Sequence, residues 1–326
     1  MAHRLILLSL LAWPTLAVPV PVPVPAPVEC VVPSKPGGAM DLTCKLVQQG
    51  FSLLAPHAPG QLRISYLPGG IGAVAWHSML SERRRAEPNT LVVFSDGSLL
   101  NMAQGKFGKA GAADVRWVAA LGADYGMIAV RKDSPFKTLA DLTAALKSHP
   151  EDVLIGVSGT IGSQDWVKMA LLARQTGVPP KALRFVALEG GGEAFTALQA
   201  GYVQVVSGDA SEATLNRGRG NTRVLAVLSE KRLPGALADV PTAREQGVDV
   251  VWPIIRGIWM GPQVPEADYQ RWVGSFGRML AAPQFAEMRA RAGLYPFALS
   301  GAALTAYVNK AVADYGKRAA ELGLMR

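Results

Sequence analysis

A repeated unit of strand, glycine-rich turn and helix is the feature of this sequence that most constrains its fold. One copy places an apolar strand at residues 30–33, a turn at 36–38 and a helix at 41–51, and a later copy starts with a strand at 154–157. Alternating strands and helices are typical of a mostly parallel sheet with helices on both faces. The sequence therefore predicts an α/β protein.

The repeats form two groups, because the pattern starts again in the middle of the chain. We expect one domain from residues 29–128 and 254–326 and a second from 129–253, each a mostly parallel sheet flanked by helices. Extended segments at 128–131 and 251–260 are expected to cross between them as a hinge. Open α/β sheets bind ligands at the carboxyl ends of their strands. Two such domains that face each other would therefore line one cleft with their turns.

The N-terminal end of the chain reads as an export signal. Residues 1–4 are short and basic, residues 5–13 are apolar, and Ala17 closes a stretch of small residues that suits signal peptidase. The apolar run is too short to span a bilayer. We expect cleavage after Ala17, so that residues 1–17 are a signal peptide and the mature protein is periplasmic. Residues 18–28 alternate valine and proline and are expected to form an extended polyproline spacer.

Cys30 and Cys44 are the two cysteines of the chain. An even pair in an exported protein indicates a disulfide, here between a predicted strand and the helix that follows it. Together with four scattered histidines, the cysteines form no cluster with the spacing of metal ligands. Neither a metal site nor a cofactor is therefore expected.

The formal net charge of the chain is +8, and its basic residues are scattered. The one short basic run, Arg83 to Arg85, reads as a solvated helix end. Nucleic-acid binding requires a basic stripe with stacking aromatic residues, and the sequence has no such stripe, so no nucleic-acid partner is expected. A mild positive field would instead attract a small anion.

Four turns at predicted strand ends carry glycines and hydroxyl groups suited to an anion. They lie at residues 34–38, 95–98, 158–164 and 190–193. Glycine lets the backbone approach a ligand and turn its N–H groups toward it, and a following helix adds its positive end. The predicted ligand-binding residues are Ser34, Lys35, Gly37, Gly38, Ser95, Ser98, Ser158, Gly159, Thr160, Gly162, Ser163, Gln164, Gly191, Gly192, Asp209 and Arg256.

Lys35 and Arg256 each have two interpretations. Lys35 could add a full positive charge to the first turn, or it could be solvated beside a turn that is merely tight. Arg256 lies inside the apolar run 252–260, and a buried arginine is costly unless it is paired. Its partner would be either the ligand carboxylate, held by a bidentate fork, or a structural carboxylate.

Enzymatic motifs are weak in this chain. The sequence contains no G-x-S-x-G elbow, P-loop or H-E-x-x-H motif. Gly70-x-Gly72-x-x-Ala75 follows a predicted strand, and Asp96 lies downstream at a strand end, which is the layout of a dinucleotide site. The turn is longer than that motif requires, and an exported enzyme would have to find its nicotinamide cofactor outside the cytoplasm. An exported dinucleotide-binding enzyme is therefore the least favoured alternative.

Several long motifs resemble the receptors of tripartite tricarboxylate transporters, and the similarity runs from about Glu29 to the C-terminus. It is carried by ECVVPSKPGG at 29–38, YLPGGIGAVA at 66–75, GSLLN at 97–101, DYGMIAVR at 124–131, IGSQDW at 161–166, EGGGE at 189–193 and WPIIRG at 252–257.

The resemblance implies a two-domain periplasmic binding protein of the Venus flytrap kind, similar to type II. Backbone amides and ordered waters from both domains would hold the carboxylates of the ligand. The resemblance also implies a receptor without enzymatic activity, which delivers its ligand to a large and a small membrane subunit of a tripartite transporter. We expect the receptor to be a monomer.

At Lys35 and Arg256 the sequence is more similar to the tricarboxylate-binding branch of this family. Two cations suit a ligand with more negative charge, so a citrate-like tricarboxylate is expected. Ala39 and Met40 depart from the family pattern, in which a further glycine and an aromatic residue are common. The alternatives are a dicarboxylate or amino-acid receptor and a ligand-sensing partner of a two-component system.

Overall fold

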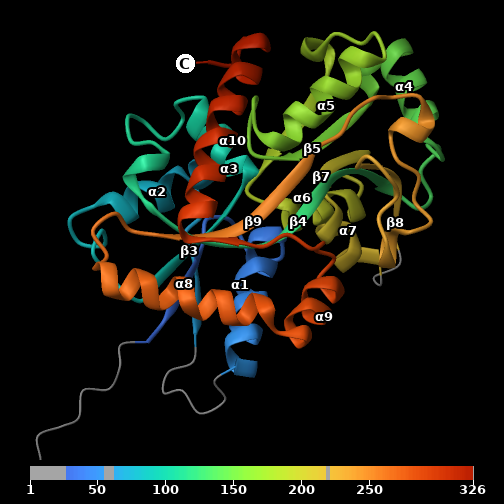
Figure 1. The fold of residues 1–326 in the computed structure, drawn as a ribbon. Coiled ribbons are helices and arrows are strands. Elements are labelled where there is room, and N and C mark those ends of the chain that lie inside the picture. The colour runs from blue at the N-terminus through green and yellow to red at the C-terminus, as the bar shows by residue number, and fades with distance from the viewer. Residues whose placement is uncertain (1–26, 55–61, 218–220, 326) are drawn as a thin grey trace, which may run out of the picture.

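The structure of the protein is a computed structural model that describes residues 27–54, 62–217 and 221–325. Strands and helices alternate along the chain, so the predicted α/β class is confirmed (Figure 1). The predicted signal peptide (1–17) and nearly all of the predicted spacer (18–28) lie outside the described residues. Within the described ranges, no helix combines the length and the apolar character that a membrane crossing requires.

The elements follow the predicted repeat. The strands are β1 Glu29–Val32, β2 Arg63–Tyr66, β3 Thr90–Ser95, β4 Arg116–Arg131, β5 Leu154–Ser158, β6 Arg184–Leu188, β7 Val205–Asp209, β8 Thr222–Leu228, β9 Pro253–Met260 and β10 Leu299–Ser300. The helices are α1 Ala39–Leu54, α2 Ala73–Leu80, α3 Asp96–Ala103, α4 Leu139–Ser148, α5 Gln164–Gln175, α6 Gly191–Gln199, α7 Ala210–Arg217, α8 Glu266–Ala281, α9 Pro283–Arg291 and α10 Gly301–Glu321.

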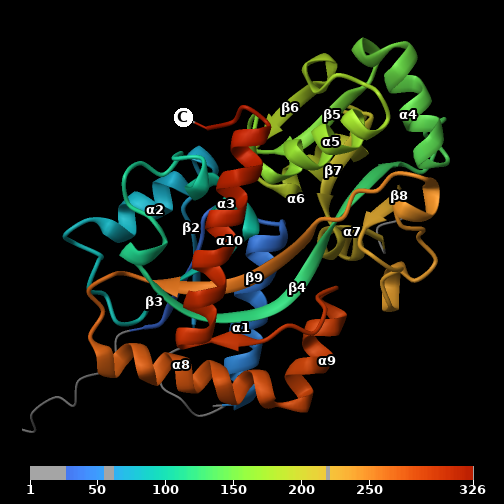
Figure 2. The same cartoon turned by 45° about the horizontal axis from the view of Figure 1, so that its top comes forward.

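The sheet of the described chain is continuous, with the strand order β2-β1-β3-β9-β4-β7-β5-β6 and with β8 and β10 each paired to β4. Strands β1, β2 and β3 are parallel, and so are β5, β6 and β7. We call β1–β3, β9, β10, α1–α3 and α8–α10 the first half, and β5–β8 and α4–α7 the second half. Strand β4 belongs to both halves, and Figure 2 shows it running beside β9 and curving from one half into the other.

In the sequence, residues 115–120 and 127–130 read as two separate strands, but in the structure β4 is one strand of 16 residues. Two residues of β4 between these segments, Asp124 and Gly126, are of types that are common in turns. In the structure both are sites of close contact. Asp124 is fully buried and paired with Arg256, and a Cβ atom on Gly126 would lie 2.6 Å from Cδ of Lys168.

The crossing between the halves falls where β4 changes its pairing partner. It pairs with β9 as far as Tyr125 and with β7 and β8 from Gly126 onward, slightly before the expected crossing at 128–131. The division into a domain of residues 29–128 and 254–326 and a domain of residues 129–253 remains our proposal.

Helices α3 and α7 are two additions to the predicted elements, and each directly follows a strand. Helix α3 begins at Asp96 because Ser95 caps it: the Ser95 hydroxyl accepts a hydrogen bond from the Gly97 N–H at 3.2 Å. Serine, aspartate and glycine at a strand end are also typical of loops, which is why the sequence did not distinguish the two cases.

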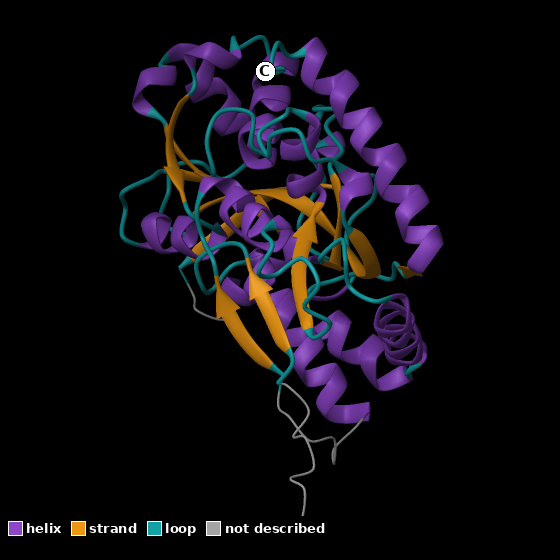
Figure 3. Cartoon of the chain, turned by 90° about the vertical axis from the view of Figure 1, so that its left-hand side faces the viewer, coloured by secondary structure: helices purple, strands orange, loops and turns teal. Residues whose placement is uncertain are grey.

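Helices cover both faces of the sheet (Figure 3). In the first half, α1 packs with α8 through ring contacts of Phe51 with Trp272 and Phe276. In the second half, the apolar side chains of α4 and α5 share one core cluster, and those of α6 and α7 share another. This packing buries the faces of the sheet and leaves the strand ends free to form a site.

The predicted disulfide between Cys30 and Cys44 is confirmed, and it ties β1 to α1 with a Cα–Cα distance of 5.9 Å. Replacing both cysteines by alanine should lower the free energy of unfolding by about 3 kcal/mol, because closing a loop of this length restricts the unfolded chain. Urea denaturation would measure the loss. A reductant should lower the wild-type midpoint and leave the variant unchanged, and equal midpoints for the oxidised wild type and the variant would contradict the prediction.

Candidate functional site

A cavity of about 380 Å³ lies between the two halves, and both halves contribute to its walls. Within the described chain, five helices begin at its edge. Helices α1 and α3 belong to the first half, and α5, α6 and α7 belong to the second. They meet there because each follows a strand directly or after a short turn, and parallel strands place their carboxyl ends at one edge of the sheet.

The helix starts give this cavity its anion-binding character. The first N–H groups of a helix have no partner within it, and the aligned peptide dipoles place about half a positive charge there. Of the five helices, α1 is the longest, with 16 residues. An anion in the cavity would therefore meet backbone donors from both halves at once.

Most of the residues predicted to bind ligand lie on the wall of this cavity. Those that line it are Ser34, Gly38, Ser95, Ser98, Ser158, Gly159, Thr160, Ser163, Gln164, Gly191, Asp209 and Arg256. Lys35, Gly37, Gly162 and Gly192 are not among the lining residues and instead join the two halves beside the cavity.

The wall also contains residues that the sequence analysis did not select. They are Pro33, Ala39, Met40, Gly70, Ile71, Gly97, Asn101, Asp165, Ala187, Leu188, Glu189, Gly190 and Glu212. Several adjoin the predicted turns, so a wider window around each strand end would have included them. Gly70 and Ile71 belong to the glycine turn that was weighed above as a dinucleotide motif, and both line this cavity. Ile71 holds the left-handed conformation there, with φ of 58°.

Arg256 has structural carboxylates as partners, the second of its two interpretations. Its side chain is buried, and its guanidinium pairs with Asp124 at 2.9 Å and with Asp209. Ser211 donates a further hydrogen bond to Asp124 at 2.6 Å. Although burial alone would lower it, the pKa of Arg256 is raised by the charges of Asp209 and Asp124. Arg256 is thus a charged but already paired part of the wall.

Lys168 forms a second buried ion cluster behind the wall. Its ammonium group lies 2.7 Å from Asp165 and 2.9 Å from Asp209. Gln164 donates to both carboxylate oxygens of Asp209 at 3.2 Å. Asp209 therefore links the two buried cations, and their charges together hold its pKa below the usual value despite burial.

Glu212 reaches across the cavity from the second half to the first. Its Oε1 accepts a hydrogen bond from the N–H of Ala39, the first residue of α1, at 2.9 Å. Its Oε2 accepts one from the N–H of Asp209 at 3.2 Å. Burial, followed by the charges of Asp209 and Asp165, raises the pKa of Glu212 to about 8.

Direct contacts close the cleft on one side of the cavity. The N–H of Lys35 donates to the carbonyl of Glu189 at 3.3 Å, and the Lys35 ammonium pairs with Glu193 at 3.0 Å. There Gly37 and Gly192 approach each other so closely that a Cβ atom on Gly192 would lie 2.6 Å from the carbonyl carbon of Gly37. Lys35 is half-exposed, so its charge is shared with solvent and Glu193.

A second set of contacts joins the halves near the start of α5. Gln104 donates to the carbonyl of Gly162 at 2.8 Å, and Lys106 donates to the carbonyl of Ile161 at 3.0 Å. Both donors belong to the first half and both acceptors to the second. The structure is therefore a closed arrangement, in which the halves touch on both sides of the cavity.

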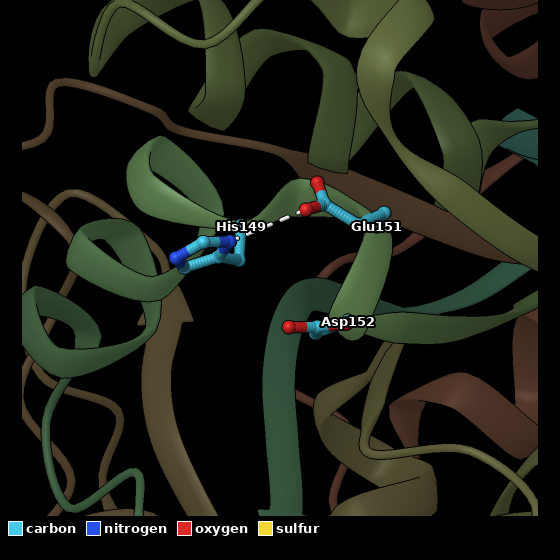
Figure 4. Close-up of side chains that lie close together, drawn as sticks. All are labelled: His149, Glu151 and Asp152. Carbon is cyan, nitrogen blue, oxygen red and sulfur yellow. Dashed lines mark hydrogen bonds and ion pairs between the residues drawn. The ribbon is translucent and has the colours of Figure 1, made fainter.

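One group of potential metal ligands occurs in the described chain, and it lies apart from the cavity. His149, Glu151 and Asp152 are exposed on the segment between α4 and β5 (Figure 4). His149 and Glu151 are hydrogen-bonded to each other at 3.2 Å. Exposed acidic groups of this kind are common on protein surfaces, and the group has no part in the site described here.

A family model and several solved structures are similar to this chain. The model of the "Tripartite tricarboxylate transporter family receptor" matches residues 97–324. A search of curated protein sequences finds no match.

Several solved structures share the fold over nearly the whole chain. MatC (Rpa3494) from Rhodopseudomonas palustris with bound malate has 22% sequence identity and a TM-score of 0.76, covering 90% of this chain and 99% of its own. The periplasmic binding protein BugD has 20% identity and a TM-score of 0.80, covering 92% and 98%. R. palustris Rpa4515 with adipate has 21% identity and a TM-score of 0.78, covering 92% and 98%. The fold is thus that of the periplasmic binding proteins, as predicted.

Proposed function

Because the chain belongs to the tripartite tricarboxylate transporter receptor family, we propose that it binds a small carboxylate anion in the cavity between its halves and delivers it to the membrane subunits of such a transporter. The chain is a solute receptor and not an enzyme. The observation that carries the proposal is the convergence of five helix starts, two from one half and three from the other, on a single cavity. That arrangement suits a ligand with more than one carboxylate, because each end can meet backbone donors of a different half.

The choice of carboxylate depends on charge. The expected preference for a tricarboxylate rested on Lys35 and Arg256 as additional cations. Lys35 pairs with Glu193 beside the cavity, and Arg256 pairs with Asp124 and Asp209. Charge therefore does not favour three carboxylates over two.

The ligands named for similar structures are dicarboxylates, malate for MatC and adipate for Rpa4515. We propose a dicarboxylate of this size range as the ligand class, with citrate as the tricarboxylate to be compared. The proposed place of action is the periplasm, after removal of residues 1–17. Closure around the acid would then present the closed form to the membrane subunits, since a ligand favours the state that binds it more tightly.

Calorimetric and thermal-shift titrations would test this function with malate, succinate, adipate, aspartate, citrate and a nicotinamide dinucleotide. We expect at least one carboxylate to bind, and at about 100 times its Kd to stabilise the protein by about 2.7 kcal/mol. The dinucleotide should leave the melting temperature unchanged. Binding of the dinucleotide alone, or of none of the acids, would contradict the proposal.

A further inference from the structure

Glu212 occupies a position at which an anion is expected to bind. Its carboxyl group lies on the N–H of Ala39, at the positive end of α1, although Glu212 itself belongs to α7 in the other half. The fit is tight, because a Cβ atom on Gly191 would lie only 1.9 Å from Oε1 of Glu212. An internal carboxyl group thus already fills one of the five helix starts.

The charges around the cavity leave Glu212 without a cation of its own. The acidic residues that line the wall are Asp165, Glu189, Asp209 and Glu212, and Arg256 is the one basic residue among the lining residues of the described chain. Arg256 and Lys168 form ion pairs with the aspartates, whereas Glu212 has no ion pair among the described residues. Each further carboxylate on a ligand would therefore add repulsion that no cation in the wall offsets.

Asn101 gives a second and independent indication of what the wall accepts. Its side chain lines the cavity and is only 1% exposed. Its amide nitrogen donates to the carbonyl of Ile71 at 3.3 Å, while its Oδ1 has no hydrogen-bond partner in the described chain. A buried acceptor without a donor is costly, so a ligand that brings a donor would be favoured at this wall.

We propose that Glu212 sets the charge of the ligand, so that the cavity favours an organic acid with few carboxylates, and above all one that also carries an ammonium group, over a tricarboxylate. This inference rests on the proposed function and specifies the ligand of the same site. When it is ionised, the Glu212 carboxylate repels the additional carboxylate of a tricarboxylate and attracts an ammonium group. Asn101 supplies a further acceptor for the hydrogen bonds of that ammonium group.

The effect of Glu212 should depend on pH, because Glu212 repels an anion only when it is ionised. With its pKa raised to about 8, it is mostly neutral at acidic pH and mostly charged at clearly alkaline pH. Discrimination against a tricarboxylate should therefore increase as the pH rises. The charged groups that act on Glu212 itself are Asp209 on β7, Asp165 on α5 and Arg256 on β9. Further charged groups lie beside these or beside the start of α1 and α6: Lys168 on α5, Asp124 on β4, Asp41 on α1, and Glu193 on α6 with its partner Lys35.

The test compares glutamate, glutarate and tricarballylate, three acids that share one dicarboxylate chain and differ by an ammonium group or by an additional carboxylate. Calorimetry at about pH 9 should show wild-type affinity falling in that order, with glutamate at least about tenfold tighter than tricarballylate. Aspartate and succinate form a shorter pair that should show the same preference for the amine. At about pH 6, the wild-type affinity for tricarballylate should lie closer to the affinity for glutamate than it does at about pH 9.

Glu212→Gln removes the charge with little change of shape. At about pH 9 it should reduce the ratio of the affinity for glutamate to the affinity for tricarballylate at least about tenfold. The matched control is Glu193→Gln, which removes an acid of the same type from the exposed pair with Lys35. This control should leave the ratio of the two affinities unchanged. Circular dichroism and melting temperatures establish that each variant is folded, and the wild-type pH series needs no variant at all.

The outcomes separate this inference from the proposed function. Tightest binding of tricarballylate by the wild type at about pH 9, or an equal change in both variants, would overturn the role of Glu212 and leave the carboxylate receptor intact. Binding of none of these acids would overturn the proposed function and this inference together.

Discussion

Replacing Gly192 by alanine is expected to weaken ligand binding at least about a hundredfold while both halves remain folded. The added Cβ atom would lie 2.6 Å from the carbonyl carbon of Gly37 and 2.9 Å from the carbonyl oxygen of Pro36. These are backbone atoms of the opposite half, so no side chain can move aside. Gly192 itself lies in the first turn of α6, where alanine favours the helix. The substitution should therefore act on closure alone.

Calorimetry with the tightest-binding acid would measure the loss, and small-angle scattering with that acid present would show whether the variant stays more open than the wild type. Gly277→Ala is the matched control, because it lies in α8 and its added Cβ atom would meet nothing within 4 Å. Wild-type affinity in Gly192→Ala would show that the contact between Gly37 and Gly192 is not required for binding.

Arg256→Ala is expected to lower the free energy of unfolding by about 3–5 kcal/mol, because it leaves Asp124 and Asp209 buried without this partner. This corrects the interpretation of Arg256 as a cation that pairs with the ligand. On that interpretation, the substitution would weaken ligand binding without loss of the fold. Urea denaturation without ligand would measure the effect.

Arg271→Ala provides the comparison for this change. Arg271 forms an exposed pair with Asp268 at 2.8 Å, and its loss should cost at most about 1 kcal/mol. Similar losses in the two variants would mean that the buried pairs of Arg256 contribute little to stability.

The location of the cavity could be predicted from the sequence because it follows from topology. Ser95 and Ser158 end strands of two parallel sets, and the ends of parallel strands meet at one edge. Glycines at 38 and 191 then identify the turns whose backbone lies against the cavity. Local patterns sufficed here, since both the strand ends and the turns are encoded by short segments.

The charge of the site could not be predicted, since it depends on which distant residues pair. The burial of Arg256 was evident from its apolar neighbours, but nothing in the sequence links it to its partner Asp124, which lies 132 residues away. Glu212 comes three residues after the end of β7. Its position against Ala39 arises only when the halves pack together. No spacing in the sequence carries that information.

A crystal structure of the protein with its tightest-binding acid would examine the ligand position itself. We predict the acid inside the cavity between the halves, with its carboxylates on the N–H groups that begin α3, α5 or α6. An acid bound at any other place on the molecule, or held there by Lys35 and Arg256 side chains instead of the helix starts, would contradict this description of the site.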